Sequence, residues 1–405
     1  MELNVYHQEM LAGRHGYAAR KAMEILAALG TIYGAARMVP VSSVQIAGVS
    51  YDNLGEAGLG FLSEMAEGGG KARVLTTLNP AGMDVENWQA MGISAEFAAQ
   101  QQRVLDAFAR MGVVTTCTCT PYLVGNLPRF GEHIAWAESS AVCYANSVLG
   151  ARTNREGGPS ALAAALTGFT PAYGLHLPAN RRPTLSVQVE ARVDSTAAFG
   201  ALGRCVGELL EASGRKHIPY ITWDKDCGRI ETVSLEQLKS LCASIATYGG
   251  VALFHMPGIT PEAAQFQPPE EKLVISQAAL DQALRAMSDA SSEAVDFVSL
   301  GCPHLTLAEI ARLADLLRGK KVKKTFWITT ARPVKHMADR MGYTQTIEAS
   351  GATFAVDTCC VVAPIKGRFH ALATDSAKAC YYAYSKNKMK TLILPFEQVV
   401  EEALK

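Results

Sequence analysis

Five of the ten cysteines occupy one kind of position along the chain. Each follows a short apolar run that predicts a buried strand: Cys117 and Cys119 in TTCTCTPYL, Cys302 in LGCPHLTLAEI, and Cys359 and Cys360 in DTCCVVAP. The carboxyl ends of strands are the edge where open α/β sheets bind ligands. Three thiolates converging there would suit iron, or an iron–sulfur cluster with one iron left open. Alternatively, these cysteines are small core residues, as most free cysteines are.

The other cysteines lie in helical or mixed contexts and are expected in the core: Cys143, Cys205, Cys227, Cys242 and Cys380. No CxxC…CxxC spacing occurs, so the sequence does not predict a zinc ribbon. Ten cysteines in 405 residues are far fewer than a disulfide-stapled scaffold carries. Residues 1–17 show no export signal, so we expect reduced thiols and a cytoplasmic protein.

A second concentration of polar residues lies at 131–160 and contains Glu138, Ser139, Arg152 and Arg155. It ends in RTNREGGPS, which leads into an alanine-rich helix predicted at 160–167. Glycines before a helix start, with arginines nearby, suit a carboxylate or phosphate. The alternative is an ordinary capped helix entry with solvated charges.

Two further segments could bind anions. The Gly-rich stretch AGVSYDNLGEAGLGF, residues 47–61, lacks the Lys-Ser/Thr of a P-loop, so nucleotide hydrolysis is not indicated. Its GEAGLG is only a weak match to a dinucleotide fingerprint, because the glycines read GxxGxG. Lys378 lies near the predicted start of a helix, where its ammonium would either hold an anion or remain solvated.

These residues are positioned by an alternation of helical and strand patterns. Strands are predicted at 72–78, 112–116, 184–190, 218–223, 251–255, 295–300, 325–329 and 352–357, and helices at 17–29, 95–111, 160–167, 197–214, 234–247, 275–289, 306–317, 332–342 and 375–386. The alternation predicts a multi-domain α/β fold with mixed or parallel sheets flanked by helices. Joints near 177–183 and 257–270 divide it into residues 1–180 with the substrate loops and first cysteines, 181–290, and 291–405 with the remaining cysteines.

Composition excludes several function classes. Lys and Arg number 38, and so do Asp and Glu, which argues against a general nucleic-acid binder. Hydrophobic residues make up 49% of the chain, enough for a sizeable core. No apolar run reaches the roughly 18–20 residues of a membrane span.

Several of these segments together resemble one family. AGVSYDN, TLNPAGMD, CTPY, WAESSAV, YANSVLGARTNREGGPSALAAALTG, GCPH and DTC resemble the large chain of the aconitase X family, and they cover nearly the whole sequence. The resemblance implies a multi-domain α/β lyase that carries an iron centre and removes water from a hydroxylated acid. Its iron centre would be mononuclear, 2Fe–2S or 4Fe–4S.

By matching motifs, the resemblance implies that Cys119, Cys302 and Cys359 bind iron, with Cys117 as a possible substitute for Cys119. It implies a substrate site formed by Gly48, Val49, Ser50, Asn79, Pro80, Glu138 and Ser139, with Lys378 as a further candidate. Arg152, Arg155 and Lys378 could supply the extra cationic clamp that a phosphate needs.

The resemblance also implies a partner, because members of the superfamily need a small swivelling domain that contributes a serine base. We therefore expect a separate small subunit. The candidate catalytic residues within this chain are Glu138, Ser139 and His304.

Two substrates follow from the resemblance. An alanine-rich composition without Lys and Glu enrichment is typical of a mesophilic bacterium. This favours dehydration of cis-3-hydroxy-L-proline to pyrroline-2-carboxylate, with phosphomevalonate as the alternative. A different class of function is a non-catalytic iron–sulfur sensor or scaffold, against which the retained cysteines and Glu138 both argue.

Overall fold

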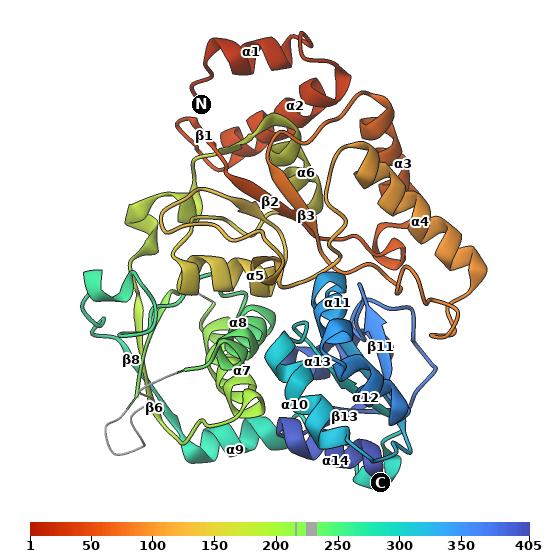
Figure 1. Cartoon of the computed structure of the whole chain (residues 1–405). Helices are drawn as coiled ribbons and strands as arrows, with labels where there is room; N and C mark the ends of the chain where they lie inside the picture. The colour runs from red at the N-terminus through yellow and green to blue at the C-terminus, as the bar shows by residue number, and fades with distance from the viewer. Residues whose placement is uncertain (215–216, 224–232) are drawn as a thin grey trace. The chain divides into compact units, whose positions relative to one another are not determined.

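The computed structural model describes residues 1–214, 217–223 and 233–405. These form two compact units, Met1–Arg182 and Pro183–Lys405 (Figure 1). Cys227 lies outside the described residues, whereas Cys143, Cys205, Cys242 and Cys380 are buried, as expected of core residues. Among the described residues, no helix combines the length and apolarity needed to cross a bilayer.

Unit 1 is built on a parallel sheet with strand order β3-β2-β4. The strands are β2 (Ser43–Ile46), β3 (Leu75–Leu78) and β4 (Ala135–Trp136), and a separate antiparallel pair joins β1 (Met38–Pro40) to β5 (Phe169–Pro171). Gln45 pairs with Thr77 on one side and with Trp136 on the other, so the carboxyl ends of all three strands form one edge.

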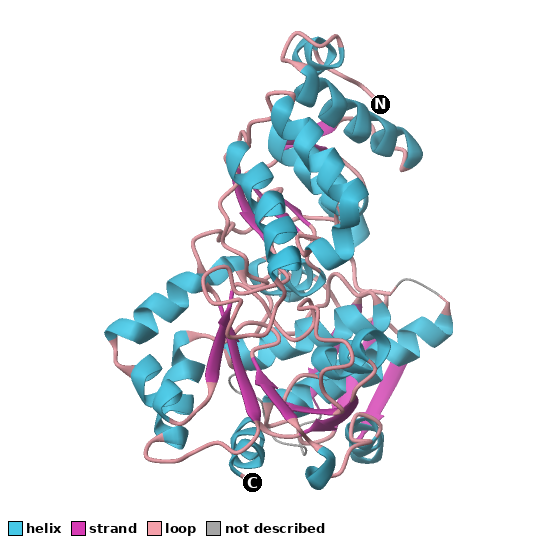
Figure 2. Ribbon diagram, turned by 90° about the vertical axis from the view of Figure 1, so that its right-hand side faces the viewer, coloured by secondary structure: helices cyan, strands magenta, loops and turns pink. Residues whose placement is uncertain are grey.

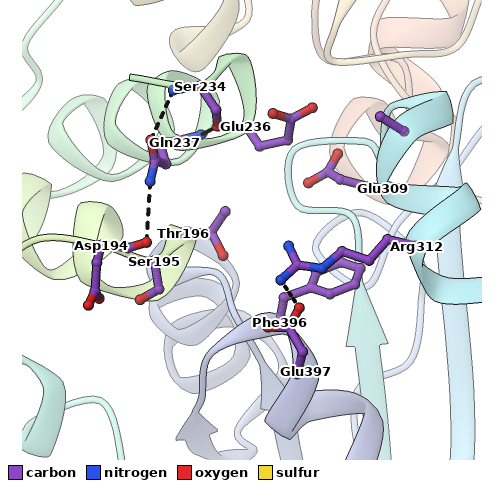
Figure 3. Close-up of a pocket in the computed structure, with 11 residues that line it drawn as sticks. Asp194, Ser195, Thr196, Ser234, Glu236, Gln237, Glu309, Arg312, Phe396 and Glu397 are labelled. Carbon is purple, nitrogen blue, oxygen red and sulfur yellow. Dashed lines mark hydrogen bonds and ion pairs between the residues drawn. The ribbon is translucent and has the colours of Figure 1, made fainter. Parts of the chain in front are cut away.

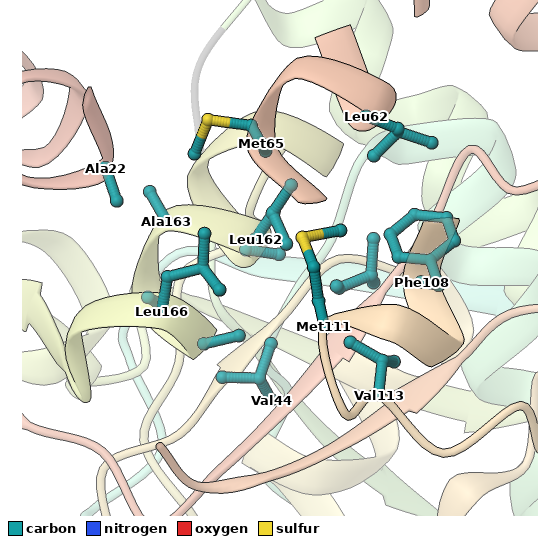
Figure 4. Close-up of a cluster of buried hydrophobic side chains, with 14 of the residues drawn as sticks. Ala22, Val44, Leu62, Met65, Phe108, Met111, Val113, Leu162, Ala163 and Leu166 are labelled. Carbon is teal, nitrogen blue, oxygen red and sulfur yellow. The ribbon is translucent and has the colours of Figure 1, made fainter. Parts of the chain in front are cut away.

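Helices cover this sheet and build its core. They are α1 (Val5–Leu11), α2 (Tyr17–Ile32), α3 (Tyr51–Glu67), α4 (Ala95–Arg110), α5 (Ser139–Tyr144) and α6 (Gly158–Thr167). The alanines of α6 are buried on every side, because small side chains let α6 pack closely between α2 and β2. Leu162 and Leu166 of α6 meet Val44 of β2 in a cluster that also contains Phe108 (Figure 4).

Unit 2 contains two parallel sheets. The smaller has the order β7-β6-β8, from β6 (Leu185–Glu190), β7 (Pro219–Trp223) and β8 (Lys272–Ser276), and it is accompanied by α7 (Thr196–Ser213), α8 (Leu235–Gly249) and α9 (Gln277–Arg285). Glycines bring α7 and α8 together: a Cβ on Gly207 would lie 2.8 Å from the Gly249 nitrogen.

The larger sheet has the order β11-β10-β9-β12-β13 and is parallel throughout. Its strands are β9 (Phe297–Leu300), β10 (Thr325–Thr330), β11 (Thr353–Val356), β12 (Ala371–Thr374) and β13 (Lys390–Ile393); its helices are α10 (Leu307–Leu317), α11 (Arg332–Arg340), α12 (Tyr343–Ala349), α13 (Ala377–Tyr382) and α14 (Phe396–Leu404). Figure 2 shows helices flanking the strands, which confirms the α/β class with parallel sheets.

Several predicted elements differ from the structure. The expected strands at 112–116 and 251–255 are each reduced to one isolated bridge. The single helix predicted at 275–289 is instead the end of β8 followed at once by α9, because Ser276 ends the strand and caps the helix. Most of the Gly-rich stretch 47–61 is helical and belongs to α3, which has a kink at Gly55 where φ is 58°.

Candidate active site

The loops that follow β2 and β3 lie side by side at the carboxyl edge of the unit 1 sheet. After β2 come Gly48, Val49 and Ser50; after β3 come Asn79 and Pro80. Gly48 has a φ of 79°, which favours glycine. The Asn79 N–H donates to the Ile46 carbonyl, at 2.9 Å, and continues the pairing of the two strands. The sequence-predicted substrate residues of these two segments are thus brought together.

A buried glutamine joins the two loops. Gln101 of α4 has 0% exposure; its Nε2 donates to the Val49 carbonyl at 3.0 Å, and its Oε1 accepts from the N–H groups of Tyr51 (3.0 Å) and Gly82 (2.9 Å). Gln101 is absent from the residues predicted from the sequence. The available signal was its position on the apolar face of the predicted helix 95–111.

Cys119 reaches the same edge of unit 1. The segment before it runs beside β3, and the Thr118 N–H donates to the Leu78 carbonyl at 2.9 Å. Gln45 Nε2 donates to the Thr118 carbonyl at 3.1 Å and holds the segment from the neighbouring strand. Both Cys117 and Cys119 are buried. In unit 1, Cys119 therefore shares the edge with the substrate loops.

Glu138 and Ser139 follow β4 at this edge. Glu138 is the N-cap of α5, and its Oε2 accepts from the Ala141 N–H (2.7 Å) and the Ser140 hydroxyl (2.5 Å). The carboxylate is 5% exposed and is fixed by these bonds, whereas Ser139 is partly exposed. Such fixed orientation is what a substrate-positioning carboxylate requires.

The two arginines predicted near the substrate lie elsewhere in unit 1. Arg152 pairs through a bridge with His133, which precedes β4, whereas Glu138 follows that strand. The side chain of Arg155 is exposed. The structure therefore does not bring Arg152 together with Glu138, and the role of both arginines stays a prediction.

In unit 2, Cys302 lies in the loop that connects β9 to α10. Gly301, just before it, has a φ of 107°, and a Cβ there would lie 2.2 Å from the Thr329 carbonyl oxygen, so only glycine fits. Thr329 also donates from its hydroxyl to the Gly301 carbonyl at 2.7 Å and accepts the Leu305 N–H at 3.0 Å. The loop is thus pinned to β10 on both sides of the cysteine.

Cys359 and Cys360 follow β11, two strands away from β9 in the same sheet. Asp357 has the rare φ of 64° for a residue other than glycine, and its Oδ2 accepts from Nε (2.9 Å) and Nη2 (2.5 Å) of Arg332. Burial raises the pKa of the Cys359 thiol, and the ammonium groups of Lys378 and Lys386 oppose that rise. Lys378 belongs to α13, which follows β12 of the same sheet.

His304 connects the two cysteine loops. Its ring is fully buried, and Nε2 lies 3.0 Å from the carbonyl oxygen of Thr358, directly before Cys359. Because a carbonyl oxygen only accepts, Nε2 carries the proton. This contact joins the loop of Cys302 to that of Cys359 within unit 2. The catalytic role expected for His304 stays a prediction.

A small cavity adjoins Cys302, which is partly exposed. Asp375, at the end of β12, is among its lining residues, and burial together with the Glu309 carboxylate raises the pKa of Asp375 to about 6. Thr196 and Glu309 line both this cavity and a larger one of about 350 Å³. Figure 3 shows the larger cavity, where Arg312 forms an ion pair with Glu397.

The chemistry of the donor set fits an iron centre. A residue with positive φ lies one or two positions before each expected ligand: Cys117 (44°) before Cys119, Gly301 (107°) before Cys302, and Asp357 (64°) before Cys359. Non-glycine residues in this conformation are uncommon and concentrate at functional sites. Thiolates are also the ligands that iron–sulfur centres use.

Two polar atoms beside these segments lack a partner among the described residues: Asn79 Oδ1 and Thr358 Oγ1, both buried. Unsatisfied buried oxygens are typical of a site that a bound group or water completes. In the part of the chain that the structure describes, no group of three His, Cys, Asp or Glu side chains is arranged to hold a metal ion. Cys119 belongs to unit 1 and the other two ligands to unit 2, so their convergence stays a prediction.

Comparisons with known proteins identify the same family along the whole chain. Residues 1–179 match the model of the Aconitase X first domain, residues 183–285 the second domain, and residues 295–405 the third domain. The crystal structure of Thermococcus kodakaraensis aconitase X (holo-form) is similar to this chain with a TM-score of 0.90 and 43% identity over 100% of both chains.

Similar proteins carry two kinds of name. "Phosphomevalonate dehydratase large subunit" of Methanothermobacter thermautotrophicus is 46% identical over 93% of this chain and 92% of its own length. The protein of that name from Thermococcus kodakarensis is 45% identical over 94% of this chain and 95% of its own. "Cis-3-hydroxy-L-proline dehydratase" of Pseudomonas aeruginosa is 34% identical over 94% of this chain and 66% of its own.

Proposed function

The chain belongs to the aconitase X family of dehydratases, and on this basis we propose that it is the large subunit of an enzyme that removes water from phosphomevalonate. The observation that carries the proposal is that four relatives named for this activity are 42 to 46% identical. Two relatives named for cis-3-hydroxy-L-proline are 34% identical, as is a further one named for phosphomevalonate. The sequence-based preference for cis-3-hydroxy-L-proline is therefore not confirmed, and its alternative is better supported.

The reaction removes the proton next to the carboxylate and the hydroxyl one carbon further along, which together leave as water. Hydroxide is a poor leaving group, and an iron centre, when bound, supplies the Lewis acid that favours its departure. Cys119, Cys302 and Cys359 would hold that centre. The ratio of acid-labile sulfide to iron in the purified protein distinguishes a cluster from mononuclear iron.

The residues of unit 1 fit the carboxylate end of the substrate. Negative charge develops on the carboxylate as the neighbouring proton leaves, and fixed N–H donors stabilise such charge. Gly48–Ser50 and Asn79 lie in the loops at the carboxyl edge of the unit 1 sheet, where main-chain N–H groups could serve as such donors. Because Gln101 joins the two loops, both would keep their positions while the charge develops.

The phosphate end of the substrate needs a cationic partner. Lys378 follows β12, next to the strand that leads to Cys302, and it is 9% exposed. A buried ammonium at this edge would stabilise phosphate or carboxylate oxygens. In this proposal Lys378 binds the anionic substrate, and Arg152 and Arg155 are the less favoured alternatives.

The proton acceptor is proposed to come from a partner. Relatives of this chain are named as large subunits, which implies a small one. Following the family resemblance, a serine of that subunit would remove the proton. Glu138 is committed to capping α5 and to the Ser140 hydroxyl, which favours an orienting role over proton abstraction.

The test is an anaerobic assay of the chain together with its small subunit, with product formation from phosphomevalonate and from cis-3-hydroxy-L-proline followed by NMR. Iron and acid-labile sulfide are measured on the same preparation. Cys302→Ser is expected to lose iron and turnover, whereas Cys242→Ser, which changes a buried thiol of α8, should keep both. Turnover of cis-3-hydroxy-L-proline alone would refute the substrate proposed here. Binding of the small subunit without iron or turnover would favour a scaffold.

A further inference from the structure

A buried ion pair borders the loop that carries Cys302. Lys239 of α8 and Glu309 of α10 lie 2.7 Å apart, Nζ to Oε2, with side chains 2% and 10% exposed. Both residues line the small cavity that Cys302 also lines. Two charges removed from water in this way incur a large desolvation cost, and an apolar pair of similar volume is often as stable. The pair therefore calls for an explanation other than stability.

The pair contacts the loop at two points. Lys239 Nζ donates to the His304 carbonyl at 2.9 Å, and Glu309 Oε2 accepts the Thr306 N–H at 2.8 Å. Between these points the His304 ring reaches the Thr358 carbonyl at 3.0 Å. The lysine is thus connected to the loop of Cys302 through the His304 backbone and to the loop of Cys359 through the same residue's side chain.

We propose that Lys239 is a positioning residue for the metal centre: its ammonium fixes the His304 carbonyl and thereby holds the two cysteine loops of unit 2 in register. The inference rests on the proposed function for the identity of the bound group. A lysine suits this task because its ammonium donates to the Glu309 carboxylate and to a backbone carbonyl at the same time. The anchor comes from α8, which lies far from both cysteines in the sequence.

The chain offers a matched control at the other end of the larger sheet. Lys324, directly before β10, pairs with Glu402 at 2.5 Å and also donates to the Ser292 carbonyl at 2.8 Å. Its side chain is 14% exposed and that of Glu402 is 1% exposed. It has the same combination of partners as Lys239, but it lies at the amino end of the strands and holds no cysteine loop.

The experiment compares Lys239→Met, Lys324→Met and the double variant Lys239→Met/Glu309→Met. Melting temperature reports stability, iron retained after anaerobic gel filtration reports the centre, and mass spectrometry of alkylated Cys359 in iron-free protein reports opening of the loop. Both single variants are expected to melt lower than the parent. Only Lys239→Met should also lose iron. Its Cys359 should be alkylated faster than that of Lys324→Met, and the rate should differ by about tenfold if Lys239 contributes 1.4 kcal/mol to loop closure.

The double variant separates positioning from stability. Because it removes the Glu309 carboxylate together with its ammonium partner, it should melt higher than Lys239→Met, while Cys359 stays reactive and iron stays loosely held. Equal Cys359 reactivity and equal iron retention in the two single variants would overturn the proposal, and so would full protection in the double variant. A parent protein without iron after reconstitution would refute the proposed function instead, and the alkylation contrast would still decide the positioning role.

Discussion

Replacement of Gln101 by leucine should damage both the stability of unit 1 and the substrate site. Leucine has a similar volume but leaves the Val49 carbonyl and the N–H groups of Tyr51 and Gly82 without their partner. An unsatisfied buried group costs about 1–3 kcal/mol, so the three sum to at least about 3 kcal/mol. In a unit of this size each kcal/mol lowers the melting temperature by about 2–4 °C, which gives a decrease of about 6–12 °C.

Replacement of Gln101 should also impair catalysis, because the two loops of the candidate substrate site lose the side chain that joins them. Residues 48–50 and 79–82 would no longer be held together, so we expect a higher KM and a lower kcat for phosphomevalonate. Gln102→Leu is the matched control, because Gln102 is exposed on the same helix and its side chain donates to Asp106 of that helix. Melting curves and NMR-monitored dehydration are measured for both variants. If Gln101→Leu and Gln102→Leu behave alike, the loops keep their geometry without Gln101 and the reasoning fails.

Three further predictions concern unit 2. Gly301→Ala should lose iron and unfold at lower temperature than Gly319→Ala, because both glycines have positive φ but only the first has a carbonyl oxygen 2.2 Å from the new Cβ; iron analysis and melting curves check this. The pKa of Asp375 is raised from 3.8 to about 6 in the folded state. The protonated carboxyl therefore contributes fully to stability below pH 4, and this contribution falls by about 3 kcal/mol as the pH rises through 6. Asp375→Asn should abolish that loss, as measured by denaturation between pH 3 and pH 8. Arg332→Met removes both hydrogen bonds to Asp357 and should speed alkylation of the following cysteines in iron-free protein; an unchanged rate would show that Asp357 keeps its conformation unaided.

Much of the helical part of the fold could be predicted, because the longer helices carry a clear amphipathic pattern. Amphipathic periodicity and apolar runs located α2, α4, α7, α8 and α10, and strands β6, β9, β10 and β11. The missed strands include β1, β2, β4, β5, β12 and β13, each of two to four residues, which are too few for an alternating pattern. The equally short β9 and β11 were located by their apolar sequences, FVSL and TFAV, and not by alternation. β8 was hidden for another reason: Ser276 belongs to the strand and caps the following helix, so the two elements share one continuous pattern.

The candidate site could be predicted only in part. Strand ends indicated where the cysteines lie, and the structure places Cys302 and Cys359 on the same edge of one sheet. It also pairs Arg152 with His133, at the amino end of β4, whereas Glu138 follows the carboxyl end of that strand. The polar segment 131–160 includes both ends of β4, so its charged residues do not all lie at the same edge. Residue composition alone does not say to which end of a strand a charged residue belongs.

Gln101 and Lys239 explain why motif reading stops short of the whole site. Each lies on a helix outside every recognised motif, and each bonds to main-chain atoms of the loops that carry the candidate site residues. A loop that is held through its main-chain atoms can have any side chains. Its sequence therefore does not reveal which residue elsewhere in the chain holds it. The residue that holds the loop can be recognised from its helix instead, where it is a polar residue on the face that periodicity assigns to the core. A polar side chain at such a position is costly unless it is hydrogen-bonded, and in this chain both are. Searching predicted helices for buried-face polar residues should therefore find the residues that hold catalytic loops, which a search for reactive side chains passes over.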